Sequence, residues 1–223
     1  MTESVFAKHE AKNYPYIFHG TLLIGTLCGG IPTDSAKAEG WIKSKLADKD
    51  AILRDEVAKL MVERGIDAEA AADEFAMNRH LNGFKRDDQG LYIEGRQLKA
   101  CIKEAASVAV AAGTLKGGRA WGNTNKGLAS FLPEHVFVRE DRLHLGVTEP
   151  TRIVQRFVHT FRGSGIQYEE VVDEAKVEFS VESDWKFTDK EWATLWLTAE
   201  RQGLGASRSQ GFGRFTVVRW DAA

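Results

Sequence analysis

The segment GLGASRSQGFGRF, from Gly203 to Phe215, gathers residue types that bind the oxygens of phosphates and sugars. Glycine adopts positive φ and lets the backbone come close to a ligand. Arginine, serine and glutamine side chains donate hydrogen bonds to phosphate and sugar oxygens. The contact residues that this composition predicts are Gly203, Gly205, Ser207, Arg208, Gly211, Gly213 and Arg214. The structural alternative is a long turn whose arginines point into water.

Basic segments without acids point to the same chemistry elsewhere in the chain. The net charge of −2 argues against a strongly cationic nucleic-acid binder, but residues 105–133 and 151–168 contain no acid. Such stretches favour one positive face for a polyanion. The contacts that these two segments predict are Lys116, Arg119, Trp121, Lys126, Arg156 and Arg162. Among them Trp121 would stack on a base. The alternatives are a loop that docks a neighbouring subunit and the solvated face of a strand.

The composition is ordinary for a globular protein. With 223 residues, 43% hydrophobic and 28% charged, the chain is long enough to bury a real core. We expect no membrane span, because no apolar run approaches the ~20 residues that one needs. We expect no secretory signal, because the first residues lack a basic segment followed by an apolar stretch. Cys28 and Cys101 have no metal-ligand spacing, so we expect no metal or cofactor and a reducing, cytoplasmic location.

Hydrophobic periodicity predicts an α+β chain. Strands are expected at 16–28, 90–94, 151–160, 175–183 and 214–220, a hairpin at 135–147, and helices from residue 96 and over 188–203. The acidic block 34–78 is typical of a helical insertion, and 113–131 of a long basic loop. This order is compatible with a βαββαβ sheet that carries insertions. With no internal repeat or linker, we expect one domain over 1–223.

Three segments, in this order, resemble the repeat-associated mysterious protein (RAMP) superfamily of CRISPR systems. They are the strand TLLIGTLCGGIP, the strand–turn–helix segment YIEGRQLKACIKEA and the glycine-rich loop before the last strand. The segment YEEVVDEAKVEFSVES is also similar to the strand before the family's final helix. The chain departs from the family pattern at Glu94, Ala100 and Lys103, where the family carries proline, glycine and arginine.

This resemblance, nearest to the RNA-binding backbone subunits of effector complexes, implies a modified ferredoxin-like, RRM-like sheet that binds RNA along one face. Arg96, Lys99 and Lys103 would extend the phosphate track along one helix. The function that the resemblance implies is an RNA-binding subunit of a CRISPR-type ribonucleoprotein, without catalysis of its own. The expected partners are single-stranded or guide RNA and copies of itself or other effector subunits.

Two alternatives come from other functional classes. The first is a metal-independent CRISPR RNA-processing endoribonuclease in which His159 or His19 acts as general acid or base. A surface or satisfied histidine is the plainer interpretation of each. Asp34 is a further catalytic candidate, with a helix N-cap as its structural role. The second alternative is a stand-alone RAMP-like protein, cellular or phage-encoded, that binds a nucleotide or another protein.

Overall fold

The computed structural model describes residues 14–32, 58–59, 61–65, 67, 81–116, 128–160 and 163–223. The chain divides into two compact units. Unit 1 comprises residues 1–28, 86–149 and 172–223, and unit 2 comprises residues 29–85 and 150–171. The boundary falls inside one long strand, β9 (Gly163–Ser183). The expectation of a single domain over 1–223 stays a prediction.

The main sheet of unit 1 has the strand order β10–β1–β9–β6. Its strands are β1 (Tyr16–Cys28), β6 (Val136–Val138), the second half of β9 and β10 (Phe215–Ala222). β1 is antiparallel to β10, and the register shifts between Thr21 and Leu22. Alternate residues of β9 point inward, so Val177, Phe179 and Val181 are buried. These side chains form the sheet's contribution to the core.

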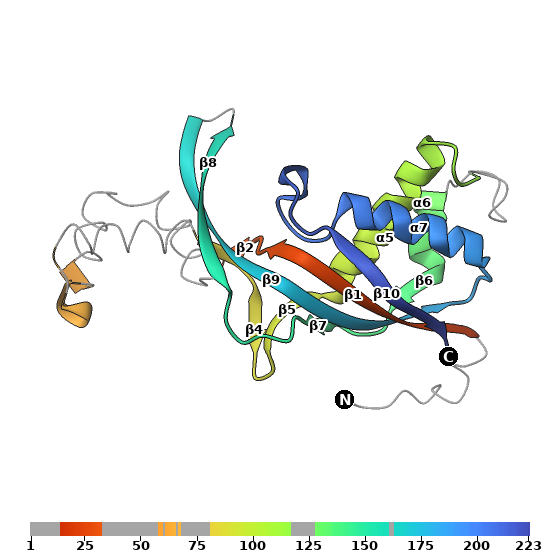
Figure 1. Ribbon diagram of the computed structural model, residues 1–223, viewed down its shortest axis with the longest axis horizontal. Coiled ribbons are helices and arrows are strands. Elements are labelled where there is room, and N and C mark those ends of the chain that lie inside the picture. The colour runs from red at the N-terminus through yellow and green to blue at the C-terminus, as the bar shows by residue number, and fades with distance from the viewer. Residues whose placement is uncertain are drawn as a thin grey trace. The chain divides into compact units, whose positions relative to one another are not determined.

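Helices α5 (Gly95–Ala111) and α7 (Asp189–Gln202) cover the inner face of this sheet. Figure 1 shows them, with the short α6 (Leu128–His135), on one side of β1, β9 and β10. α5 begins at a capping box of Glu94 and Gln97, and α7 begins at a capping box of Thr188 and Glu191. The apolar stripe of α5 is buried at Leu98, Cys101, Ile102, Ala105, Ala106 and Ala109.

An aromatic cluster fills the core between α7 and the sheet. Trp220 of β10 stacks on Phe18 of β1 with ring centroids 4.9 Å apart, and it contacts Trp192 and Trp196 of α7. Large aromatic side chains bury ~150–250 Å² each. The last strand is therefore held to the final helix by side chains as well as by its pairing with β1.

A smaller sheet has the order β4–β5–β7, from strands β4 (Lys85–Asp87), β5 (Gly90–Glu94) and β7 (Arg142–His144). The predicted hairpin over 135–147 is wrong, because β6 pairs with β9 whereas β7 pairs with β5. The segment between β6 and β7 is held by hydrogen bonds from residues of other elements. The amide of Gly95 donates to the carbonyl of Asp141, and the amide of Ser180 donates to the carboxylate of Glu140.

Unit 2 contains β2 (Ile31–Pro32), β3 (Leu81–Gly83), β8 (Arg152–Thr160) and the first half of β9. β3 is parallel to β9, and β8 is antiparallel to it over its whole length. Most of the predicted helical insertion over 34–78 lies outside the described residues. Residues 58–59 and 61–64 are helical, and Gly65 follows with a φ of 65°.

The structure is thus a mixed α+β fold. In unit 1 the chain order β1–α5–β6–β9–α7–β10 and the sheet order β10–β1–β9–β6 are consistent with the predicted ferredoxin-like βαββαβ arrangement. Among the described residues, no helix combines the length and apolarity that crossing a membrane requires.

Candidate nucleic-acid interface

The glycine-rich loop joins α7 to β10 and contains one short 3₁₀ turn, Arg208–Gln210. Its backbone has positive φ at Gly203, Gly205, Ser207, Gly211 and Gly213. Only glycine adopts this region without a steric cost. The conformational argument from the sequence is therefore correct for all four glycines.

The two ends of the loop pack against the protein itself. The amide of Leu204 donates to the carbonyl of Gly213 over 2.8 Å, and the amide of Gly213 donates to the carbonyl of Thr26 over 2.7 Å. A Cβ on Gly213 would run into the backbone of Leu204, and one on Gly203 would meet the backbone of Gly213 at 2.9 Å. These two glycines therefore serve close approach inside the molecule, whereas the sequence argument assigned that approach to a ligand.

The tip of the loop is open. A Cβ on Gly211 would have no neighbour within 4 Å. Within the part of the chain that the structure describes, the amides of Gly205, Ala206 and Ser209 have no hydrogen-bond partner. Successive unpaired amides in a turn with alternating handedness make a concave anion-binding surface. A Cβ on Gly205 would meet Cδ1 of Leu27 at 2.9 Å, so the features expected for phosphate contact remain at residues 206–211 and at the amide of Gly205.

Arg208 at the tip forms an ion pair with Glu104 of α5. Both side chains are partly exposed, 34% for Arg208 and 49% for Glu104. The hydrogen bond to Glu104 raises the pKa of Arg208 above its ordinary value. Arg214, at the end of the loop, is exposed, and its carbonyl accepts a hydrogen bond from the amide of Gly25. Among the described residues, the side chain of Arg214 has no partner.

The three cations predicted on α5 have different surroundings. Arg96 pairs with Glu94 at the start of the helix. The ammonium of Lys99 lies 3.9 Å from the ring centre of Phe137, and desolvation lowers the pKa of Lys99. Lys103 is exposed, and its ammonium has no partner in the described regions. Of the three, Lys103 is the one best placed to meet a phosphate.

The remaining candidates belong to unit 2, lie at the edge of a described range, or fall outside the described residues. Arg156 belongs to unit 2, where its Nε lies 2.9 Å from the carboxylate of Glu169, which is 3% exposed. Lys116 is exposed at the end of the described range 81–116. His159 lies on β8, but its side chain is outside the description. The candidates that fall outside the described residues altogether are Asp34, Arg119, Trp121, Lys126 and Arg162.

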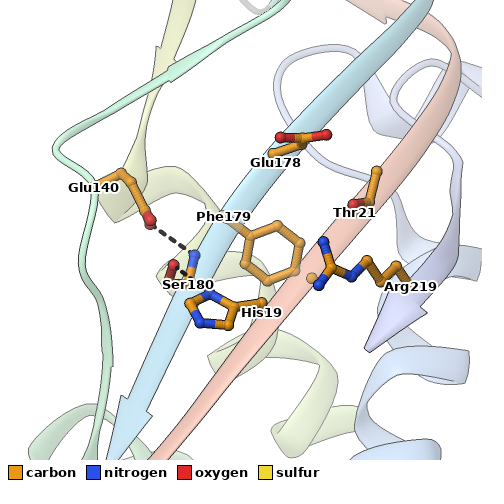
Figure 2. Close-up of a pocket in the computed structure, with 8 residues that line it drawn as sticks. His19, Thr21, Glu140, Glu178, Phe179, Ser180 and Arg219 are labelled. Atoms are coloured by element: carbon orange, nitrogen blue, oxygen red, sulfur yellow. Dashed lines mark hydrogen bonds between the residues drawn. The ribbon is translucent and has the colours of Figure 1, made fainter. Parts of the chain in front are cut away.

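A second feature of unit 1 is a polar pocket of about 220 Å³ on the outer face of the sheet. Figure 2 shows side chains from β1, β9 and β10 converging on it, together with Glu140 from the segment after β6. The residues that line it are His19, Gly20, Thr21, Glu140, Glu178, Phe179, Ser180 and Arg219. The sequence argument named only His19 among them. The alternation of His19 and Thr21 with buried neighbours was the one signal in the sequence.

Hydrogen bonds hold the walls of this pocket. Nδ1 of His19 lies 3.1 Å from the hydroxyl of Ser180. Nζ of Lys176 donates to Oε1 of Glu178 over 2.7 Å, and this bond lowers the pKa of Glu178. Nε of Arg219 donates to Asp221 over 2.7 Å. Among the described residues, no group of three or more potential metal ligands comes together.

Comparison with known proteins finds likeness in structure only. No protein-family model matches the chain, and no curated protein matches it. One solved structure that is similar is a chain of "Cryo-EM structure of the Type III-B Cmr-beta bound to cognate target RNA", with a TM-score of 0.50 and 11% sequence identity. The likeness shows the fold. It covers 96% of this chain but only 62% of that chain, so the chain spans less than two thirds of its neighbour.

Proposed function

We propose that this protein binds single-stranded RNA at the glycine loop of unit 1 and acts as a subunit of a CRISPR-type ribonucleoprotein. The observation that carries the proposal is the open tip of the glycine loop, where unpaired amides lie beside Arg208. The fold likeness to a chain of an RNA-bound type III-B complex supports the same class of function. The resemblance of the three sequence segments to RAMP proteins agrees with it.

The ion pair between Arg208 and Glu104 is compatible with this role. Both side chains are partly exposed, and exposed ion pairs contribute only ~0–1 kcal/mol. The pair is therefore weak enough to open, and a phosphate can take the place of the carboxylate once Glu104, which is 49% exposed, turns away into water. Backbone amides of the tip would bind the same phosphate, and Lys103 and Arg214 would neutralise its neighbours. The loop would then bind a phosphate both through oriented backbone amides and through nearby positive charges.

Strand β1 connects the end of the loop with the pocket. The amide of Gly25 on β1 bonds to Arg214 at the loop's end, and six residues earlier His19 lines the pocket. At roughly 3.3 Å per residue, β1 extends ~20 Å between these two points. A strand of RNA that leaves the loop along β1 would thus reach the pocket within a few nucleotides.

The endoribonuclease alternative assigns the acid–base role to His159 or His19, and the structure argues only against Glu178 as an additional proton acceptor. His19 and Glu178 share the pocket with Arg219, and these residue types suit general acid–base chemistry on a phosphodiester. However, the hydrogen bond from Lys176 lowers the pKa of Glu178. A lowered pKa makes this carboxylate a poorer proton acceptor, because efficient general bases have a pKa near the working pH.

The test of RNA binding is a fluorescence-anisotropy titration of the full chain with short labelled oligouridines at several salt concentrations. Arg208→Ala and Arg214→Ala are each expected to weaken binding. Each should also reduce the slope of log K against log salt by about 0.7 for every phosphate that the variant no longer neutralises. Lys190→Ala, an exposed lysine at the far end of α7, is the matched control and should leave the slope unchanged. No salt-dependent affinity for any RNA would overturn the proposal.

The nuclease alternative needs a separate assay. End-labelled RNA is incubated with the protein in EDTA, and the products are separated by length. We expect no cut. Cleavage that His19→Ala or His159→Ala abolishes would replace the binding proposal with the endoribonuclease.

A further inference from the structure

The pocket on the outer sheet face has unused hydrogen-bonding capacity that points inward. Thr21 is only 4% exposed, yet among the described residues its hydroxyl has no hydrogen-bond partner. Its oxygen is not among the described polar atoms that are both sealed from solvent and unpaired, so the hollow gives water or a ligand access to it. Figure 2 places Thr21 at the pocket between Glu178 and Arg219. This residue is the observation that marks the hollow as a built site.

The charged groups keep free atoms as well. Glu178 uses Oε1 for Lys176 and Arg219 uses Nε for Asp221. Among the described residues this leaves Oε2 of Glu178 and both terminal nitrogens of Arg219 without a hydrogen bond. Nε2 of His19 is also free within the described chain, since Nδ1 makes the bond to Ser180. Glu140 fixes the backbone of Ser180, and Ser180 in turn holds the imidazole. The pocket therefore presents acceptors, donors and a ring whose orientation is set.

We infer that this pocket receives one guanine base of the bound single-stranded RNA. The inference rests on the proposed function for the strand that delivers the base. Guanine has two adjacent donors, N1–H and the N2 amino group, that match a carboxylate. It also has two adjacent acceptors, O6 and N7, that arginine binds bidentately. Glu178 and Arg219 supply these complementary groups from two strands of the same sheet.

Shape and stacking agree with a single heterocycle. The volume of about 220 Å³ is below the ~300–1,000 Å³ of pockets for drug-sized ligands. Gly20 forms part of the wall, and a Cβ there would run into the ring of Phe179. That collision is with a core ring on the inner side of the sheet, so the stacking surface that the pocket offers a base is the imidazole of His19. Bases splayed out from single-stranded RNA stack on histidine rings and on arginine planes while their edges are read by hydrogen bonds.

Other occupants fit less well. A phosphate would face the carboxylates of both Glu140 and Glu178. A lysine or arginine side chain of a partner protein would face the free terminal nitrogens of Arg219. Like charges at such short range repel. Adenine offers a carboxylate one amino donor without the neighbouring N1–H, so it would leave the Glu178 side of the pocket less satisfied.

The experiment compares the affinity of the full chain for oligouridines that carry one central guanosine, inosine, adenosine or no purine. We expect the guanosine probe to bind about tenfold more tightly than the adenosine probe, because its extra hydrogen bonds go to charged groups. Inosine, which lacks the N2 amino group, should fall between them. Equal affinity for all four probes, with the salt dependence retained, would overturn the guanine pocket and leave the proposed function standing.

Two variants and a control locate the effect. Glu178→Gln and Thr21→Val are expected to reduce the guanosine preference to less than about twofold while the affinity for plain oligouridine stays within the same range. Glu63→Gln removes an exposed carboxylate outside the pocket and should preserve the preference. A preference that survives both pocket variants places guanine recognition elsewhere and contradicts the inference.

A second measurement tests which ligand the pocket binds, even if the protein binds no RNA. The imidazole resonances of His19, assigned by comparison with His19→Gln, are followed by NMR while guanosine, uridine or N-acetylarginine amide is added. A shift with guanosine alone supports the inference. A shift with the arginine compound alone assigns the pocket to a protein partner, and no shift with any of them leaves the hollow without a ligand; both results overturn it.

Discussion

Among single residues, Asp87 on β4 has the most developed set of ionic contacts in unit 1. Its carboxylate accepts a hydrogen bond from Arg142 over 2.7 Å and lies 3.0 Å from Nε2 of His144. Arg142 also lies over the ring of Tyr92. The hydrogen bond from Arg142 is the main cause that lowers the pKa of Asp87 below its ordinary 3.8. This cluster holds the β4–β5–β7 sheet together at its exposed side.

The lowered pKa predicts how stability depends on pH. A carboxyl group whose folded-state pKa lies below its unfolded value stabilises the protein above the unfolded value, and the effect is lost as the pH falls through the folded value. Asp87→Asn should therefore unfold at lower urea than the parent at pH 7. The difference in urea midpoint between the variant and the parent should shrink below pH ~4. Asp88→Asn, in the adjacent exposed turn, should have the same urea midpoint as the parent at every pH.

Arg156 and Glu169 in unit 2 form an ion pair that, unlike the cluster at Asp87, is largely shielded from water. Their side chains are 15% and 3% exposed. Removing one partner of a buried pair leaves an uncompensated charge, which costs about 3 kcal/mol or more. Arg156→Met is thus expected to lower the free energy of unfolding by about 3 kcal/mol, as measured by urea denaturation.

Arg152→Met on the same strand is the control for that experiment. Arg152 is exposed, so its loss should change the free energy of unfolding by less than about 0.5 kcal/mol. If the two variants are equally stable, the pair between Arg156 and Glu169 is not what holds β8 to β9. Arg156 would then be available as the RNA contact that the sequence predicted.

Among the elements, the glycine loop needs glycine for two different reasons: a positive φ, and a lack of space for a Cβ. Gly213 has a φ of 75° and no room for a Cβ against Leu204, whereas Gly211 has a φ of 92° and open space around it. Gly211→Ala should cost only the backbone strain, about 1–2 kcal/mol. Gly213→Ala adds the collision with Leu204 and should cost more, with a clear fall in thermal midpoint or a failure to fold. Equal midpoints for the two variants would contradict this division.

The sequence predicted those elements whose boundaries depend on local signals. The capping box at Thr188 and Glu191 and the stop at Gly203 place α7 correctly, and the β-branched and apolar run over 16–28 places β1. The prediction was less accurate for β9: periodicity placed the strand over 175–183 and the family resemblance extended it to 168–183, but it starts at Gly163. The polar residues before Ala175 are typical of a turn. In the structure Glu174 adopts a φ of 59° inside a continuing strand, as a β-bulge residue does.

The candidate site could be predicted only in part, for the same reason. The loop and Arg208 are found from composition, since a glycine-rich, arginine-containing segment is visible in the local sequence. The pocket around Thr21 depends on the register between β1 and β10, which shifts at that residue, and on the order β10–β1–β9. Strand order and register are long-range properties that periodicity does not contain. Glu178 and Arg219 therefore could not be grouped with His19 in advance.

For the whole molecule, association with copies of itself, one of the partners expected from the sequence, predicts that the number of protomers bound depends on RNA length. Head-to-tail contacts between copies are heterologous and continue along a lattice. The number of protomers bound should therefore rise in steps as the RNA is lengthened to two and three times the minimal bound length. Mass photometry on these complexes measures the steps. A constant stoichiometry of one would contradict self-assembly while leaving RNA binding by the monomer intact.

The thiol of Cys101 donates to the carbonyl of Gly203 over 3.4 Å, at the junction where the loop leaves α7. Burial raises the pKa of this thiol to about 12, so at neutral pH it is almost wholly protonated and inert toward alkylating reagents. Any labelling must therefore wait for the junction to come apart. In a Cys28→Ala background, the rate of alkylation measures how often α5 and the loop separate. Slower labelling with RNA present would mean that bound RNA reduces the opening of this junction, although the RNA need not contact Cys101 itself.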